Sequence, residues 1–146
     1  MRDALHGAGI DERSFAWGEV YLVDDSEICF PATPAQKRKQ EERPAVVVQC
    51  NDYCTNPVYP VVLIAPISSI KNLKGRLPFD LDVPSGEAGL KLPSVIHVSL
   101  VQPLLKQCLR RKIGQLSEEH ISTLQECLLA TVLPDISLHD EQEEAD

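Results

Sequence analysis

The sequence contains no apolar stretch long enough to span a bilayer. Its longest strongly apolar run, Val58 to Ile67, is far shorter than the about 20 residues that a membrane helix needs, and Pro60 interrupts it. The first residues, Met1 to Gly7, also lack the apolar segment of a secretion signal. These absences argue against a membrane protein and favour a cytoplasmic location without membrane partners.

The sequence also lacks paired metal-ligand spacings. Its five cysteines are odd in number and irregularly spaced; they are Cys29, Cys50, Cys54, Cys108 and Cys127. Cys50-x-x-x-Cys54 could form half of a zinc site, but none of the four histidines supplies a second ligand pair near it. Reduced thiols buried among apolar residues are the favoured interpretation. We therefore expect no metal and no other cofactor.

An overall basic excess, the stronger sign of a polyanion-binding domain, is missing as well. The formal net charge is −8, but residues 135–146 hold six acids and no base, which leaves 16 acids against 14 bases elsewhere. Two basic clusters stand out on this nearly neutral remainder: Lys37, Arg38, Lys39 and Arg43, and Lys106, Arg110, Arg111 and Lys112. Each could bind a polyanion or could be ordinary solvated loop charge.

The chain length and the strand-forming segments predict one small β domain. The 146 residues are enough for a single core. We expect a flexible N-terminus at 1–14, a folded domain at 15–134 and a disordered acidic tail at 135–146. Runs rich in β-branched and aromatic residues predict strands at 17–24, 45–49, 61–67, 94–101 and 109–116, with a weak edge strand at 79–83. The succession predicts a mainly β fold, a small barrel followed by one C-terminal helix.

The helix has clear start and stop signals. Ser117 is a suitable N-cap, two glutamates follow it, and Pro134 ends the segment. Four apolar residues recur at helical spacing, namely Ile121, Leu124, Leu128 and Val132. We expect this apolar face to pack on the sheet or on a partner subunit.

Polar groups at the ends of two buried strands form the candidate site. Arg43 precedes the strand at 45–49, and Ser68 and Ser69 follow the strand at 61–67. Antiparallel pairing of the two strands would bring these residues to the same end of the sheet. A guanidinium fits phosphate oxygens, and a hydroxyl can hydrogen-bond to a phosphate. The alternatives are an exposed edge arginine and an ordinary serine turn.

This pair of groups suits a substrate that supplies its own nucleophile. RNA does so, because its 2′-hydroxyl can attack the adjacent phosphodiester. The protein then needs mainly to orient the attack and to stabilise the charge that develops on the phosphate.

Five motifs resemble, in order and spacing, those of the MazF/PemK toxin family. They are Gly18 to Asp24, Arg43 to Asp52, Ala65 to Ile70, Gly89 to Ile96, and Lys112 to Ser117 leading into the helix. The resemblance spans roughly residues 15 to 133. It implies a small SH3-like barrel that acts as a homodimer. It also implies metal-independent cleavage of single-stranded RNA, such as mRNA, at short sequences, leaving a 2′,3′-cyclic phosphate and a 5′-hydroxyl.

The resemblance further implies a partner and roles for particular residues. A cognate antitoxin would cover the substrate groove with an acidic tail, and the complex would bind DNA. Arg43 matches the family's catalytic arginine, Ser68 stands where threonine is usual, and 25–42 corresponds to a loop that covers the substrate. We assign substrate binding to six polar residues near these positions: Lys37, Arg38, Lys39, Gln49, Asn51 and Ser69.

The chain departs from the family after the strand that contains Val98. Ser99 replaces a carboxylate, and Gln102 replaces an arginine. His97 lies where some members have a basic catalytic residue and could serve as a general acid or base. It could equally be an ordinary strand histidine. The predicted catalytic set is Arg43, Ser68 and His97.

Two functions therefore stay open. One is an endoribonuclease toxin. The other is a non-catalytic dimeric module of the same fold that binds RNA or an antitoxin-like tail.

Overall fold

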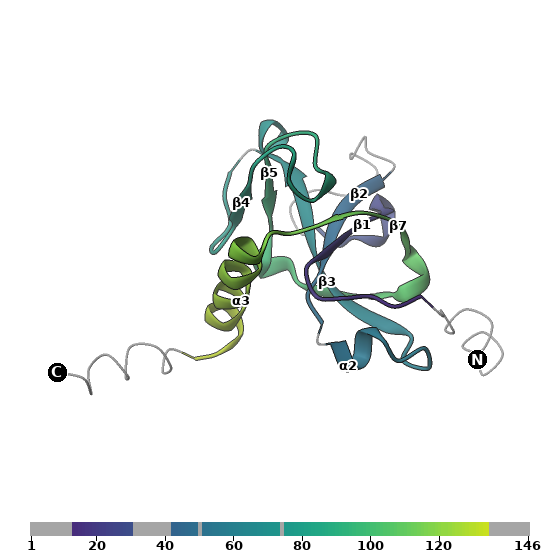
Figure 1. The fold of residues 1–146 in the computed structure, drawn as a ribbon. Coiled ribbons are helices and arrows are strands. Elements are labelled where there is room, and N and C mark those ends of the chain that lie inside the picture. Colours follow the sequence, from purple (N-terminus) through teal and green to yellow (C-terminus); the bar gives the residue numbers. More distant parts are fainter. Residues whose placement is uncertain (1–12, 31–41, 50, 74, 135–146) are drawn as a thin grey trace.

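A computed structural model describes residues 13–30, 42–49, 51–73 and 75–134 (Figure 1). Its seven strands are β1 (Glu19–Asp24), β2 (Glu42–Val47), β3 (Val61–Ser69), β4 (Leu81–Val83), β5 (Ser94–Ile96), β6 (Gln102–Leu105) and β7 (Leu109–Gln115). The helices are α2 (Asn51–Cys54) and α3 (Glu118–Val132), with 3-10 turns η1 (Asp25–Glu27), η3 (Ile70–Asn72), η4 (Glu87–Gly89), η5 (Val98–Leu100) and η6 (Lys106–Cys108). The prediction of a mainly β fold with a C-terminal helix is confirmed.

All strand pairs are antiparallel, and the sheet has the order β4-β5-β3-β2-β1-β7, with β6 pairing with β3. β3 is the longest strand and lies at the centre of this arrangement. Its first part pairs with β2 and β6, and its last residues pair with β5. β3 therefore joins the two parts of the sheet, which meet within it between Pro66 and Ile67. Figure 1 shows β3 running through both parts.

Two apolar clusters pack against opposite faces of the central strands. In β2, Ala45 and Val47 belong to one cluster, while Val46 and the following Val48 belong to the other. Successive side chains of a strand point to opposite faces, so a strand buried on both faces is apolar at every position. This explains why the sequence shows continuous apolar runs here instead of alternation.

α3 covers one of these clusters, as predicted. The Ser117 side chain accepts a hydrogen bond from the His120 amide and caps the helix, which ends before Pro134. Leu124 is fully buried, but Val132 is 71% exposed and does not pack on the sheet. The last turn extends past the sheet edge formed by β4 and β5 (Figure 1). Within the described residues, no helix has the length and apolar character needed to cross a membrane.

The predicted strand at 94–101 is also wrong in its second half. β5 ends at Ile96, the chain turns through η5, and β6 begins at Gln102. Pro103 lies within β6, which among the described strands pairs only with β3. Proline cannot donate to a ladder and is accepted on such an edge strand. The turn-rich segment after β2 contains the short helix α2, which was not predicted.

A close backbone contact between η4 and β7 requires glycine. A Cβ atom at Gly114 would lie 2.3 Å from the Ala88 carbonyl carbon, whereas a Cβ at Gly75 would meet nothing within 4 Å. We expect Gly114→Ala to lower the free energy of unfolding by about 1–3 kcal/mol, the usual cost of overpacking. Urea titration of both variants checks this, and Gly75→Ala should behave as the wild type. Equal stability of the two variants would contradict the contact.

Candidate active site

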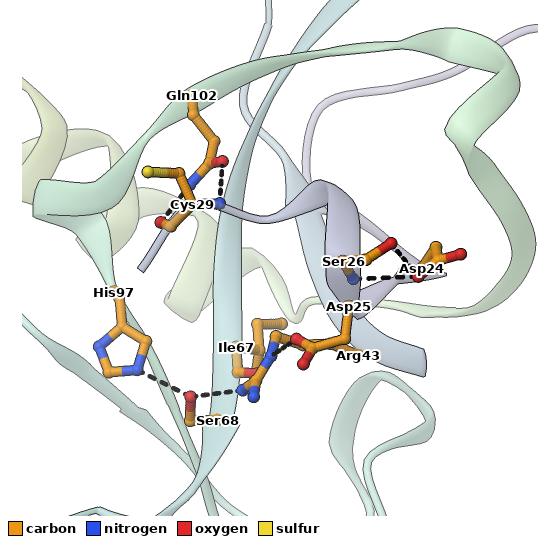
Figure 2. A network of polar contacts seen from close by, with 9 residues as sticks. All are labelled: Asp24, Asp25, Ser26, Cys29, Arg43, Ile67, Ser68, His97 and Gln102. Atoms are coloured by element: carbon orange, nitrogen blue, oxygen red, sulfur yellow. Dashed lines mark hydrogen bonds and ion pairs between the residues drawn. The ribbon is translucent and has the colours of Figure 1, made fainter. Parts of the chain in front are cut away.

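The strand register places Arg43 and Ser68 side by side. Ala45 pairs with Pro66, so two residues further along Arg43 of β2 lies opposite Ser68 of β3. Both side chains point to the same face of the sheet. The Arg43 Nη1 donates a hydrogen bond of 2.7 Å to the Ser68 Oγ (Figure 2). The predicted meeting of these two side chains is confirmed, while their catalytic roles stay a prediction.

The Arg43 guanidinium is buried and held from several sides. Its Nε donates to the Asp25 Oδ1 at 2.6 Å, and Nη1 also donates to the Ile67 carbonyl at 3.2 Å. The Phe30 ring lies over it, 4.6 Å from the Arg43 Cζ to the ring centroid. Arg43 is 7% exposed, which excludes the alternative of an exposed arginine at the sheet edge. Within the described part of the chain, its Nη2 makes no hydrogen bond.

His97, which directly follows β5, joins the same network together with Asp80 from the loop before β4. Leu81 pairs with Ile96, and one step further Asp80 faces His97. The His97 Nε2 lies 2.9 Å from the Ser68 Oγ, and its Nδ1 lies 3.2 Å from the Asp80 Oδ1. Asp80 is held in turn, because its Oδ2 accepts a hydrogen bond from the Leu77 amide.

Burial lowers the pKa of the His97 imidazole below its usual value. The nearby Asp80 carboxylate opposes this shift of the pKa, and the positive charges of Arg43 and Arg76 add to it. The side chains of His97 and Asp80 are only 5% and 2% exposed. His97 is therefore a neutral imidazole at neutral pH, which is the form that can accept a proton.

The network thus runs through five side chains from five segments: Asp25, Arg43, Ser68, His97 and Asp80. Figure 2 shows four of them, with the Ser68 hydroxyl between the guanidinium and the imidazole. Three groups therefore lie in one line: the Arg43 guanidinium, which can hold a phosphate, the Ser68 hydroxyl, and the neutral His97 imidazole. That is the chemical equipment for assisting a proton transfer next to a bound anion.

Gln102 holds the segment that covers this site. Its side-chain amide exchanges two hydrogen bonds with the Cys29 backbone, at 2.8 and 3.2 Å (Figure 2). It also donates to the Leu100 carbonyl. Cys29 directly precedes Phe30. The Phe30 ring lies over Arg43 and meets the His97 ring edge-on at 5.8 Å. Gln102 therefore fixes the segment that covers the two functional groups.

The structure does not gather all predicted substrate-binding residues at this site. Gln49 and Asn51 lie beyond the opposite end of β2, where their side-chain oxygens accept backbone hydrogen bonds from Leu63 and Trp17. Ser69 points away from Ser68, and within the described ranges its Oγ is buried without a hydrogen-bond partner. Lys37, Arg38 and Lys39 lie outside the described residues.

Sequence reasoning missed Asp25, Phe30 and Asp80. Asp80 falls in the segment predicted as an edge strand, but only the β4–β5 register shows that it faces His97. Asp25 follows the first strand directly and reaches Arg43 through the turn η1. No local pattern marks either residue. Among the described residues, no three His, Cys, Asp or Glu side chains are grouped closely enough to hold a metal ion.

Most of the sequence matches a known protein family. Residues 17–132 match the family of PemK-like, MazF-like toxins of type II toxin–antitoxin systems. The chain belongs to this family. The resemblance seen in its five motifs is thereby confirmed, and the family match covers most of the described domain.

Solved structures show that the fold is the family's fold. A mycobacterial endoribonuclease in complex with its cognate antitoxin has a TM-score of 0.61 at 14% identity, with 83% of this chain and 98% of that chain covered. A MazE–MazF complex from Deinococcus radiodurans has a TM-score of 0.59 at 16% identity, covering 83% and 97%. The Mycobacterium tuberculosis toxin MazF-mt6 has a TM-score of 0.56 at 20% identity, covering 77% and 94%.

Proposed function

We propose that this member of the MazF/PemK family is the toxin of a type II toxin–antitoxin system. It cleaves single-stranded RNA at a short sequence by attack of the 2′-hydroxyl and needs no metal. The contact between Arg43, Ser68 and His97 carries the proposal, because it joins a phosphate-binding cation to a neutral base. The family match and the endoribonuclease among its structural neighbours support it.

Each of the three residues has a defined task in this reaction. Arg43 uses its Nη2 to hold a non-bridging oxygen of the scissile phosphate and stabilises the negative charge that builds up there. Ser68 hydrogen-bonds to the reacting groups. His97 is the acceptor for the proton that the 2′-hydroxyl loses. The bond from the 2′-oxygen to phosphorus forms as the bond to the 5′-oxygen breaks.

RNA can reach these groups only if the cover moves. Arg43, Ser68 and His97 are each less than 9% exposed, and Phe30 lies against two of them. Substrate binding therefore requires the segment with Phe30 to move far enough for a phosphate to reach the Nη2 at the edge of the guanidinium. The same closure favours the second candidate, a non-catalytic module of this fold, in which the cover stays in place.

A cleavage assay tests the proposal. Purified protein is incubated with single-stranded RNA in excess chelator, and the ends of the products are determined by mass spectrometry. We expect cleavage that leaves 2′,3′-cyclic phosphate and 5′-hydroxyl ends.

The matched control is the same RNA with a single 2′-deoxy substitution at the cleaved nucleotide, which should stay intact. Chelator-sensitive cutting, or products with 5′-phosphate ends, would contradict the mechanism. No cutting of a diverse RNA pool would favour the non-catalytic module.

The partners follow from the family. We propose that a cognate antitoxin binds this chain and that two copies form a homodimer. The antitoxin complexes among the structural neighbours support the first point.

A further inference from the structure

The hydrogen-bond directions at Ser68 are determined by its two neighbours. A guanidinium can only donate, so the Ser68 Oγ accepts the 2.7 Å bond from the Arg43 Nη1. The single hydroxyl hydrogen of Ser68 can then be donated to the His97 Nε2 at 2.9 Å. The Ser68 Oγ has a second lone pair, so the tautomer of His97 decides the direction of this bond.

Asp80 fixes the tautomer of His97. An ionised carboxylate can only accept, so the proton of the neutral imidazole lies on Nδ1, and Nε2 has the lone pair that accepts from Ser68. The Asp80 Oδ1, 3.2 Å away, accepts from that Nδ1, and the Leu77 amide holds the second carboxylate oxygen at 2.8 Å. Asp80 thus selects the tautomer in which Nε2 faces Ser68 with a free lone pair.

We infer that Asp80 is a positioning residue that makes His97 a base for RNA cleavage, with the Ser68 hydroxyl as the path by which the proton reaches it. This inference rests on the proposed function. The carboxylate that Ser99 lacks is supplied here from the loop before β4, through the imidazole.

The proton moves from the substrate to His97 in two coupled transfers. The substrate 2′-hydroxyl passes its proton to the Ser68 Oγ while Ser68 passes its own to the His97 Nε2. The 2′-oxygen forms its bond to phosphorus, the bond to the 5′-oxygen breaks, and that oxygen takes a proton from water. The imidazolium, stabilised by Asp80, later returns its proton to water through Ser68. Because the Ser68 Oγ lies between the Arg43 Nη1 and the His97 Nε2, it is the group next to a phosphate held by Arg43.

Four charged residues lie near the His97 imidazole. Asp80 faces Nδ1, Arg43 lies beyond Ser68 with Asp25 behind it, and Arg76 is the remaining nearby cation. Asp80 is the only one of these that contacts the imidazole directly among the described residues. Asp82 offers a matched control, because it is an exposed acid two residues away that pairs with Arg76.

The test compares Asp80→Asn with Asp82→Asn by NMR of the ¹⁵N-labelled imidazoles. His97→Gln identifies the His97 signals among the four histidines. In the wild type and in Asp82→Asn, we expect the proton of neutral His97 on Nδ1. In Asp80→Asn, the proton should move at least partly to Nε2, because an amide can donate to Nδ1, and the pKa of His97 should fall further. A wild-type proton on Nε2, or an unchanged tautomer in Asp80→Asn, would overturn the inference.

RNA cleavage by the same variants tests the catalytic part. Asp80→Asn should lower kcat at least about 100-fold with little change in KM, as expected when a general base has the wrong tautomer. Its pH–rate profile should shift with the pKa of His97, and Asp82→Asn should match the wild type in both respects. An unchanged rate and pH profile in Asp80→Asn would exclude the positioning role.

A second variant keeps the inference testable if Asp80→Asn does not fold. Ser68→Ala leaves Asp80 in place, so it should retain the Nδ1 proton on His97 yet lose cleavage about 100-fold or more. Full activity of Ser68→Ala would exclude the proton path. If the wild type cleaves no RNA, the proposed function and the relay's catalytic role both fail, while the NMR result separately decides whether Asp80 orients His97.

Discussion

Arg43→Ala should lower kcat/KM for RNA cleavage by roughly 1,000-fold, the upper range for loss of one group that stabilises transition-state charge. The guanidinium is the one cation in the described network, and its Nη2 is not used within it. Single-turnover cleavage of a defined RNA measures the effect. Arg111→Ala is the charge-matched control, since Arg111 is an exposed β7 residue.

Two further measurements separate chemistry from folding. Removing Arg43 leaves the buried Asp25 carboxylate without its guanidinium, which can destabilise the domain. Arg43→Lys keeps a positive charge but loses the forked donor set, so it should fold and still cleave about 100-fold more slowly. Thermal unfolding of each variant shows whether it is native. A native Arg43→Ala protein that cleaves RNA at the wild-type rate would remove the phosphate assignment.

His97→Gln should lower kcat/KM by about 100- to 10,000-fold, the range for loss of a general base. In the wild type, the rate should be constant near neutral pH and fall at a pH below 6.5. The reason is that burial lowers the pKa of His97, and only the neutral imidazole accepts a proton. His97→Gln should lose this acid limb of the pH–rate profile. His120→Gln, which alters a histidine paired with Glu87 elsewhere, should retain it.

The lowered pKa of His97 also makes the free energy of unfolding depend on pH. The unfolded chain binds a proton at His97 more readily than the folded protein does, so stability rises with pH through this range. The free energy of unfolding should therefore fall as the pH drops below the unfolded pKa of about 6.5. It should fall less in His97→Gln. An equal pH dependence in the two proteins, measured by urea titration, would show that His97 is not buried in its neutral form.

The departures from the family acquire a physical meaning in this structure. Gln102, which the resemblance predicts to replace a family arginine, holds the Cys29 backbone and thereby positions Phe30 over the site. Ser99 is exposed and lies outside the network, whereas Asp80 brings a carboxylate to His97 from another segment. The two altered positions are thus accompanied by a rearranged set of contacts around the same arginine and hydroxyl.

Local patterns in the sequence determined the elements of the fold. The β-branched runs at 45–49 and 61–67 predicted two buried strands, and antiparallel pairing alone was enough to bring Arg43 and Ser68 together. Ser117 and Pro134 predicted both ends of α3, because caps and prolines act within a few residues along the chain. Such short-range rules do not require knowledge of any neighbour in space.

The tertiary structure alone decided which groups surround the arginine. Asp25, Phe30 and Asp80 carry no local signal, and their places follow from the register between strands and from turns such as η1. Gln49 and Asn51 are close to Arg43 in sequence but lie beyond the other end of β2. A strand carries successive residues apart by about 3.3 Å each, while pairing brings distant residues into contact. For that reason the site's base and its carboxylate became visible only once β3, β4 and β5 were paired.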